Sequence, residues 1–237
     1  MNKILWKPKI SKKSHVSNFI DELNRKKNLQ IDKYEELYKW SISNPKQFWE
    51  ETWKYSNIIS SSQYHEIVDD ITKMPGAEWF SGAKLNFAEN LLRFRDDRPA
   101  IHYKNENSKI KTITYKSLYR SVEALSFSLR SIGVKKGDRV AGYISNIPEA
   151  IIAMLASSSI GAIWSSTSPD FGVNGVLDRF TQIQPKVLFA TSGYSYNGKY
   201  YDSLENVHDI TRKIKSLIKV VIINQRKENV QKIKIQN

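Results

Sequence analysis

Between Pro99 and Asn224, short apolar runs alternate with segments of helical period, and this alternation restricts the fold more than any other feature of the sequence. Two of the runs, residues 187–190 and 220–223, are apolar at every position. Such runs are typical of parallel strands that are buried on both faces. Strands that alternate with helices at this spacing form βαβ units. The sequence therefore predicts an α/β fold with a doubly wound, mostly parallel sheet.

The individual elements of this region can be placed from their periods and from turn residues. The predicted strands lie at 100–104, 110–114, 139–145, 162–165, 186–190 and 220–224, and the predicted helices at 115–132, 148–158, 173–183 and 204–217. A polar turn through Glu106 and Ser108 should join the first two strands as a hairpin. Thr114 should cap the first helix and Gly133 should end it, and Pro185 should stop the helix at 173–183.

The region before Pro99 reads as a helical extension. Helices are predicted at 14–29 and 33–40, and a third begins with Asn44 as its cap and Pro45 at its first position. The aromatic cluster between Tyr34 and Tyr55 could be a ligand-stacking surface, but aromatic packing of the helices is the favoured interpretation. Three parts are expected: a helical N-terminal extension at 1–98, an α/β region at 99–224, and a polar tail at 225–237.

Composition excludes several classes of protein. Hydrophobic residues make up 40% of the chain, which is enough for a core. The absence of cysteine excludes disulfides, thiolate metal sites and a cysteine nucleophile. Residues 1–9 contain no apolar stretch of the kind found in secretory signals, and no apolar run is long enough for a membrane span. A cytoplasmic protein is expected.

The net charge of +13 allows contact with nucleic acid or with phosphorylated ligands. The basic residues are spread along the chain, however, and no basic run is combined with aromatic residues in an RNA-binding motif. A solvated basic surface is therefore favoured over a nucleic-acid-binding protein, which remains a remote alternative.

Residues 193–200, with the sequence GYSYNGKY, nearly match the phosphate-binding P-loop. A P-loop needs glycines that let the backbone N–H groups surround phosphate, a lysine that reaches the phosphate, and a small hydroxyl that holds Mg²⁺. Tyr200 stands where the small hydroxyl is required, so an NTPase P-loop is not favoured. Contact between Lys199 and a phosphate remains open.

No complete catalytic site or metal site is evident in the sequence. His65 and Asp69 could share a helix face, but a metal site needs a third ligand. His15, His102 and His208 each stand alone, and Asp178 and Arg179 fit a local ion pair. No catalytic residue and no metal ligand is therefore assigned.

Four segments resemble acetoacetyl-CoA synthetases, which are AMP-forming acid–CoA ligases. Residues 34–41 resemble the N-terminal helical region of this family, residues 78–92 the general acyl-CoA synthetase signature, and residues 133–145 a segment shared widely across adenylate-forming ligases. The most specific segment, WSSTSPDFG at 164–172, lies within the distinctive run from Ser159 to Lys186. Acetyl-CoA synthetases differ at this segment. The resemblance covers about residues 32–223 and implies the first part of the large domain of an adenylate-forming ligase.

The resemblance implies a reaction in which ATP activates acetoacetate to an acyl-adenylate, after which CoA displaces AMP. ATP, Mg²⁺ and CoA are the cofactors of the full-length family, whereas this chain is expected to bind CoA only, or none of them. The family's Ser/Thr/Gly-rich phosphate loop is not found among these residues, so the chain is expected to be inactive alone and its sheet to have unfinished, aggregation-prone edges.

One binding feature of the family can be carried over. In related acetyl-CoA synthetases, basic residues of the loop after the strand that corresponds to 186–190 contact a CoA phosphate. On that pattern Lys199 keeps one basic position, Tyr196 replaces the other, and Asn197 and Gly198 lie between them. These four residues are the candidate cofactor-binding site. The alternatives to a ligase fragment are a non-catalytic CoA- or partner-binding module and a subunit of a split ligase, which a complementary fragment would complete.

Overall fold

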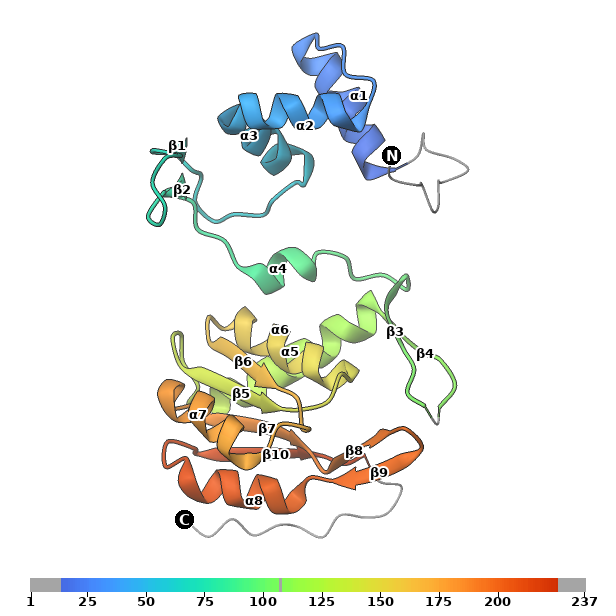
Figure 1. The fold of residues 1–237 in the computed structure, drawn as a ribbon, viewed down its shortest axis with the longest axis vertical. Coiled ribbons are helices and arrows are strands. Elements are labelled where there is room, and N and C mark those ends of the chain that lie inside the picture. The colour runs from blue at the N-terminus through green and yellow to red at the C-terminus, as the bar shows by residue number, and fades with distance from the viewer. Residues whose placement is uncertain (1–13, 107, 226–237) are drawn as a thin grey trace, which may run out of the picture. The chain divides into compact units, whose positions relative to one another are not determined.

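A computed structural model of the protein describes residues 14–106 and 108–225. The contacts between residues divide the chain into two compact units, Met1–Leu85 and Asn86–Asn237 (Figure 1). The helix α4 (Phe87–Leu91) belongs to the second unit, because Ala88 is buried in the core cluster of that unit. The domain limits at residues 98 and 224 remain a prediction, since compact units need not coincide with domains.

Three helices make up most of the first unit: α1 (His15–Lys27), α2 (Tyr34–Ser43) and α3 (Pro45–Tyr55). Ser14 caps α1, because its side-chain oxygen accepts a hydrogen bond from the backbone N–H of Ser17 at 3.1 Å. Asn28 ends α1 in the left-handed region, with φ at 52°. The three helices predicted before residue 56 are thereby confirmed, with ends that differ by a few residues.

Aromatic packing holds these helices together. The ring of Phe19 lies 5.0 Å from Tyr55 and 6.2 Å from Phe48, in edge-on contacts between α1 and α3. Trp40 of α2 contacts Phe48 in the same way at 6.4 Å. Trp40, Phe48 and Tyr55 therefore pack in the helical core, as favoured from the sequence, whereas Tyr34, Tyr38 and Trp49 are exposed.

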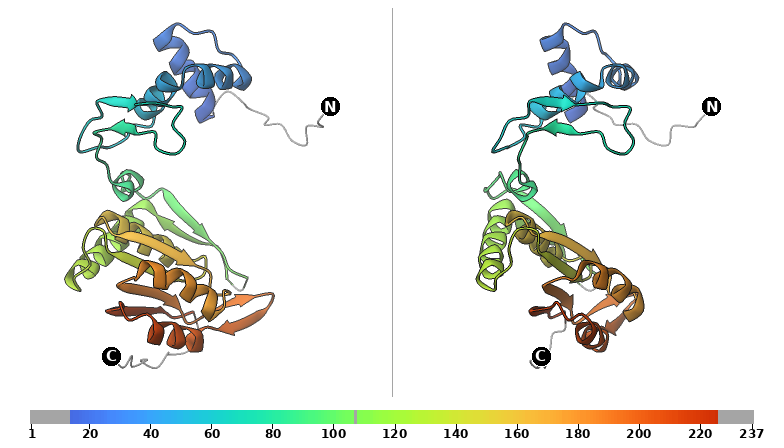
Figure 2. Two further views of the ribbon diagram at one scale, coloured as in Figure 1. Left: turned by 60° about the vertical axis from the view of Figure 1, so that its left-hand side comes forward. Right: turned by 90° about the vertical axis from the view of Figure 1, so that its left-hand side faces the viewer.

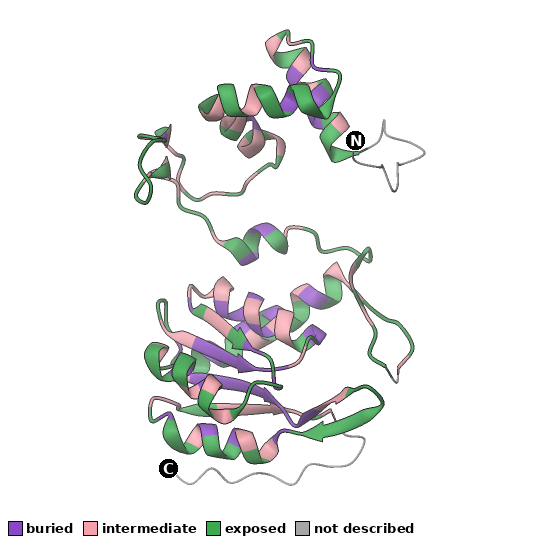
Figure 3. Cartoon of the chain, viewed as in Figure 1, coloured by how far each residue is buried: buried purple, intermediate pink, exposed green. Residues whose placement is uncertain are grey.

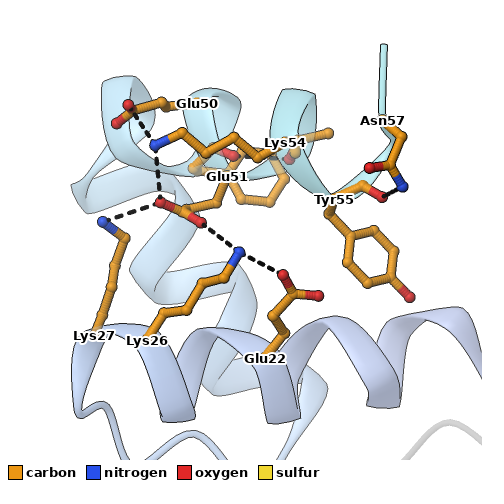
Figure 4. Close-up of polar contacts among 10 residues, drawn as sticks. Glu22, Lys26, Lys27, Glu50, Glu51, Lys54, Tyr55 and Asn57 are labelled. Atoms are coloured by element: carbon orange, nitrogen blue, oxygen red, sulfur yellow. Dashed lines mark hydrogen bonds and ion pairs between the residues drawn. The ribbon is translucent and has the colours of Figure 1, made fainter.

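A buried carboxylate also joins α1 to α3. Only 7% of the Glu51 side chain is exposed, and its oxygens lie 3.3 Å from Lys27, 3.6 Å from Lys54 and 4.0 Å from Lys26 (Figure 4). Lys26 and Lys27 stand in the last turn of α1, whereas Glu51 and Lys54 belong to α3. Glu51 therefore balances ammonium groups from both helices at their contact.

The first unit also contains a short antiparallel pair, β1 (Glu66–Val68) and β2 (Trp79–Ser81), which the sequence did not predict. Strands of three residues are too short to show an alternating period. Tertiary contact stabilises the pair instead: the ring of Trp53 stacks on Phe80, with centroids 4.6 Å apart. The predicted helix face for His65 and Asp69 is therefore wrong, because these residues flank the strand β1.

The second unit contains the predicted alternation of strands and helices. Its remaining helices are α5 (Tyr115–Ser131), α6 (Pro148–Ser159), α7 (Val173–Ile183) and α8 (Leu204–Lys213). Its strands are β3 (Pro99–Tyr103), β4 (Lys111–Thr114), β5 (Arg139–Tyr143), β6 (Ile163–Thr167), β7 (Val187–Thr191), β8 (Gly193–Tyr196), β9 (Lys199–Asp202) and β10 (Lys219–Ile223). The predicted hairpin of β3 and β4 is confirmed, and α8 ends before residue 217 because Ile214 is extended.

β5, β6, β7 and β10 form a parallel sheet in the order β10–β7–β5–β6. Helices α5 and α6 cover one face of the sheet, and α7 and α8 cover the other (Figure 2). Val187 and Phe189 pack in the first of these layers, whereas Leu188 and Ala190 pack in the second. β7 is buried along its whole length (Figure 3), which explains its continuous apolar run and confirms the predicted α/β fold.

Candidate functional site

The parallel sheet offers a ligand site where the directions of its connections diverge. From β5 the chain passes through α6 to β6 on one side, and from β7 it passes through α8 to β10 on the other. In open α/β sheets, ligands bind outside the carboxyl ends of the strands at such a switch point. The carboxyl ends of β5, β6 and β7 are therefore a candidate ligand-binding site.

The distinctive segment at 164–172 forms the carboxyl end of β6 and the loop that leads to α7. The buried hydroxyl of Tyr143 holds this loop: it lies 2.6 Å from the carbonyl oxygen of Pro169 and 3.1 Å from that of Phe171, and it donates its proton to them. Asn206 of α8 donates a hydrogen bond to the same hydroxyl at 3.4 Å. Burial raises the pKa of Tyr143, which keeps the donor proton in place.

A second contact fixes the same loop from α7. The guanidinium of Arg179 lies over the ring of Phe171, 4.8 Å from its centroid, and donates a hydrogen bond to the carbonyl oxygen of Gly175 at 2.6 Å. The structure records these contacts for Arg179 in place of the predicted local ion pair with Asp178. The loop is thus held from β5, α7 and α8.

The four candidate cofactor-binding residues lie together at one turn. β8 and β9 pair antiparallel, with Tyr196 opposite Lys199, and Asn197 and Gly198 form the two-residue loop between them. Both loop residues have positive φ, 50° for Asn197 and 73° for Gly198, as an Asn-Gly hairpin turn requires. The side chains of Tyr196 and Lys199 are exposed. The four residues therefore lie next to one another at an exposed turn, whereas the ligand that they bind remains a prediction.

The turn already holds an anion from another part of the chain. The backbone N–H of Asn197 donates to Oε1 of Glu106 at 2.8 Å, and the N–H of Gly198 donates to Oε2 at 3.0 Å. Glu106 lies in the polar turn between β3 and β4, far away in sequence. Sequence reasoning missed this contact, because no local pattern links residues so distant from each other.

The β8–β9 hairpin also excludes a P-loop at residues 193–200. A P-loop leads from a strand into a helix whose N-terminus faces the phosphate. Here the lysine opens strand β9, and the next helix, α8, starts only at Leu204. The resemblance to a P-loop is therefore accidental.

The other candidates from the sequence lie apart from one another. Within residues 14–106 and 108–225, no group of three or more histidine, aspartate and glutamate side chains is placed to hold a metal ion. Asp69 pairs with Lys73 and accepts a hydrogen bond from the N–H of Glu78, and these contacts hold its pKa well below the usual range. His102 lies 3.0 Å from the hydroxyl of Thr112 across the β3–β4 hairpin. None of the helices in the described part has the length and apolarity needed to cross a bilayer.

Two family models match the chain. The model of the AMP-binding enzymes matches residues 87–236, and the model of the acetyl-coenzyme A synthetase N-terminus matches residues 34–91. The first match covers more than half of the chain and contains the whole parallel sheet. The chain therefore belongs to the family of AMP-binding enzymes.

Within this family, the chain is similar to acetoacetyl-CoA synthetases, as the sequence resemblance implied. It is 44% identical to the protein named acetoacetyl-CoA synthetase from Macaca fascicularis, over 93% of this chain and 33% of the relative. It is 38% identical to malonamoyl-CoA synthetase vrtB from Penicillium aethiopicum, over 93% of this chain and 31% of the relative. The solved acetoacetyl-CoA synthetase from Streptomyces lividans matches with a TM-score of 0.89 and 35% identity, over 97% of this chain and 36% of that one. The chain thus spans about a third of the length of the curated relatives it matches.

Proposed function

We propose that these 237 residues are the N-terminal part of an acetoacetate–CoA ligase. In the intact enzyme, acetoacetate would attack the α-phosphate of ATP, giving acetoacetyl-adenylate and diphosphate. The thiol of CoA would then attack the acyl carbon, forming the thioester and releasing AMP. The observation that supports this proposal best is the similarity to acetoacetyl-CoA synthetases over 93–97% of the chain, both in sequence and in structure.

The part of the reaction that we assign to this chain is binding of a CoA phosphate. The N–H groups of Asn197 and Gly198 already hold a carboxylate with one hydrogen bond to each oxygen, so the turn suits an anion with two accessible oxygens. Lys199 adds a positive charge at the adjacent position, while Tyr196 replaces a second basic residue and weakens the site. CoA supplies the thiol for the second step, and this turn would anchor its phosphate.

We do not assign the ATP and Mg²⁺ sites of the proposed enzyme to these residues, and we propose that these residues alone do not form the adenylate. No Ser/Thr/Gly-rich phosphate loop occurs in the sequence. Incubating the chain with ATP, acetoacetate and Mg²⁺ should therefore release no diphosphate above background. Diphosphate release that depends on acetoacetate would refute this part of the proposal.

The CoA site can be tested by calorimetry with CoA and dephospho-CoA, which lacks the 3′-phosphate. Replacing Lys199 with alanine should weaken CoA binding by about tenfold, which corresponds to about 1.4 kcal/mol for a charged contact. The matched control is Lys215→Ala, which removes an exposed lysine outside the turn and should leave the affinity unchanged. Equal affinities of the parent chain for CoA and dephospho-CoA would count against the phosphate contact.

Two related functions differ from the first only in what completes the chain. A split ligase would gain adenylate-forming activity when a complementary fragment is added, whereas a CoA-binding module would bind CoA and gain no activity from that addition. The substrate also needs a direct test, since one relative is named a malonamoyl-CoA synthetase. A nucleic-acid-binding protein, suggested by charge alone, would be retained on DNA with a steep dependence on salt. The cytoplasmic location and the domain limits at 98 and 224 stay predictions.

A further inference from the structure

We propose that Glu106 is an internal competitor for the phosphate site, which its carboxylate occupies and which it must leave before a phosphate group can bind. The inference rests on the proposed CoA site and adds a form of regulation to it. It originates in the contact between Glu106 and the turn of β8 and β9.

The geometry of the contact is that of a bound anion. Two successive N–H groups, from residues with φ of 50° and 73°, point to the same side of the turn and make a concave donor site. Each of them donates to a different oxygen of Glu106, at 2.8 Å and 3.0 Å. A phosphate monoester offers the same pair of charged oxygens. Because each N–H has one proton to donate, carboxylate and phosphate exclude each other.

Glu106 is also placed so that it can leave. Its side chain is exposed, and within the described residues it forms no ion pair. Released from the turn, the carboxylate would pass into water, which solvates it well. A phosphate carries more charge than a carboxylate and would gain the attraction of Lys199, so it should replace Glu106 at sufficient concentration.

The size of the effect depends on the fraction of time that Glu106 occupies the turn. The apparent affinity of an external anion falls in proportion to the fraction of empty sites. If Glu106 fills the turn for about nine-tenths of the time, its removal should tighten phosphate binding by about tenfold. The displaced Glu106 would in turn release the loop between β3 and β4 from β8 and β9, since the contact joins these two hairpins.

The test uses the full chain and inorganic phosphate as the probe, observed by ¹⁵N–¹H correlation spectra. Glu106→Ala should move the amide proton resonances of Asn197 and Gly198 upfield without phosphate, and phosphate should then saturate them at about a tenth of the concentration that the parent chain needs. Glu35→Ala is the matched control, because it removes an exposed carboxylate of α2 and the same unit of charge. Glu106→Gln, which keeps one side-chain oxygen as acceptor, should give an intermediate shift.

The outcomes separate this inference from the proposed function. If the two amide resonances do not respond to Glu106→Ala, or respond equally to Glu35→Ala, the contact is refuted. If they respond but phosphate binds no more tightly, Glu106 only links the two hairpins and the competition is refuted. If phosphate binds more tightly while neither chain binds CoA, the competitor is supported and the CoA assignment fails.

Discussion

Removal of the Tyr143 hydroxyl should destabilise the second unit and loosen the loop of the distinctive segment. The side chain is fully buried, and its hydroxyl donates a hydrogen bond to the carbonyl oxygen of Pro169 at 2.6 Å. The carbonyl oxygen of Phe171 lies 3.1 Å from the same hydroxyl. In Tyr143→Phe, the buried carbonyl group of Pro169 would lose its donor. A buried polar group without a partner costs about 1–3 kcal/mol, so we expect a loss of about 2 kcal/mol.

For a unit of this size, about 2 kcal/mol corresponds to a fall in Tm of about 4–8 °C, which thermal unfolding followed by near-ultraviolet circular dichroism can measure. Hydrogen exchange adds a local measure, because the N–H of Phe171 donates to the carbonyl oxygen of Ser168 at 3.2 Å and should lose protection. Asn206→Ala removes only the longer bond of 3.4 Å and should cost less than Tyr143→Phe.

Tyr194→Phe is the matched control for Tyr143→Phe. Tyr194 is half-buried, its ring stacks on Tyr201 with centroids 5.4 Å apart, and its hydroxyl forms no hydrogen bond within the described residues. The control should keep the stacking and change stability by less than about 0.5 kcal/mol. If Tyr143→Phe were as stable as the parent chain, or if both variants lost the same stability, the hydrogen bonds of the Tyr143 hydroxyl would not stabilise the loop as described.

Three further predictions concern polar groups in the two units. Glu51→Gln should destabilise the first unit by about 1–3 kcal/mol in chemical unfolding, because Lys26, Lys27 and Lys54 would lose their shared carboxylate; an unchanged unfolding midpoint would contradict this. Thr191→Val should stabilise the second unit by about 0.5–1.5 kcal/mol and so raise its Tm, because the Thr191 hydroxyl is fully buried and has no hydrogen-bond partner in the described part. A lower Tm would contradict this, since it would mean that the hydroxyl does form a hydrogen bond. The ammonium of Lys186, 2.8 Å from Asp138, lowers the pKa of that carboxyl. A lowered folded-state pKa gives stability that is present above the unfolded pKa of about 3.9 and is lost as the pH falls through the folded value, so Asp138→Asn should be less stable at pH 7 and show a smaller decline below about pH 4. Parallel acid-unfolding curves for the two chains would contradict that assignment.

The parts of the fold that could be predicted from the sequence are those whose structure is determined by residues within one segment. Residues 187–190 are apolar without interruption because β7 is buried on both faces, and Gly133 ends α5 with φ at 87° because a left-handed residue suits glycine. The cap at Thr114 was visible for the same reason, since its side chain accepts a hydrogen bond from the N–H of Ser117, three residues later.

The parts that could not be predicted depend on contacts between distant segments. Strand β2 is fixed by the stacking of Trp53 on Phe80, and β8 and β9 were read as a loop although Asn197 and Gly198 are a strong hairpin signal. The flanking strands are rich in tyrosine and lack a clear polar face, which hid the hairpin. At the candidate site, Lys199 and its neighbours were found by resemblance, whereas Glu106 could be found only once the two hairpins were seen together.

The edges of the parallel sheet indicate how far this chain can serve as an independent protein. Among the described residues, β6 and β10 each pair with a strand on one side only. β10 has the apolar sequence of an interior strand, yet its residues 220–223 are only half-buried, whereas β7 beside it is fully buried. Ile163 and Ile218 are more than half exposed at the starts of the two edge strands. Apolar edges with unpaired N–H and C=O groups favour association with further strands. We therefore expect the isolated chain to aggregate through these edges, and, under the proposed function, the same edges would pair with strands of the remainder of a ligase or of a complementary fragment.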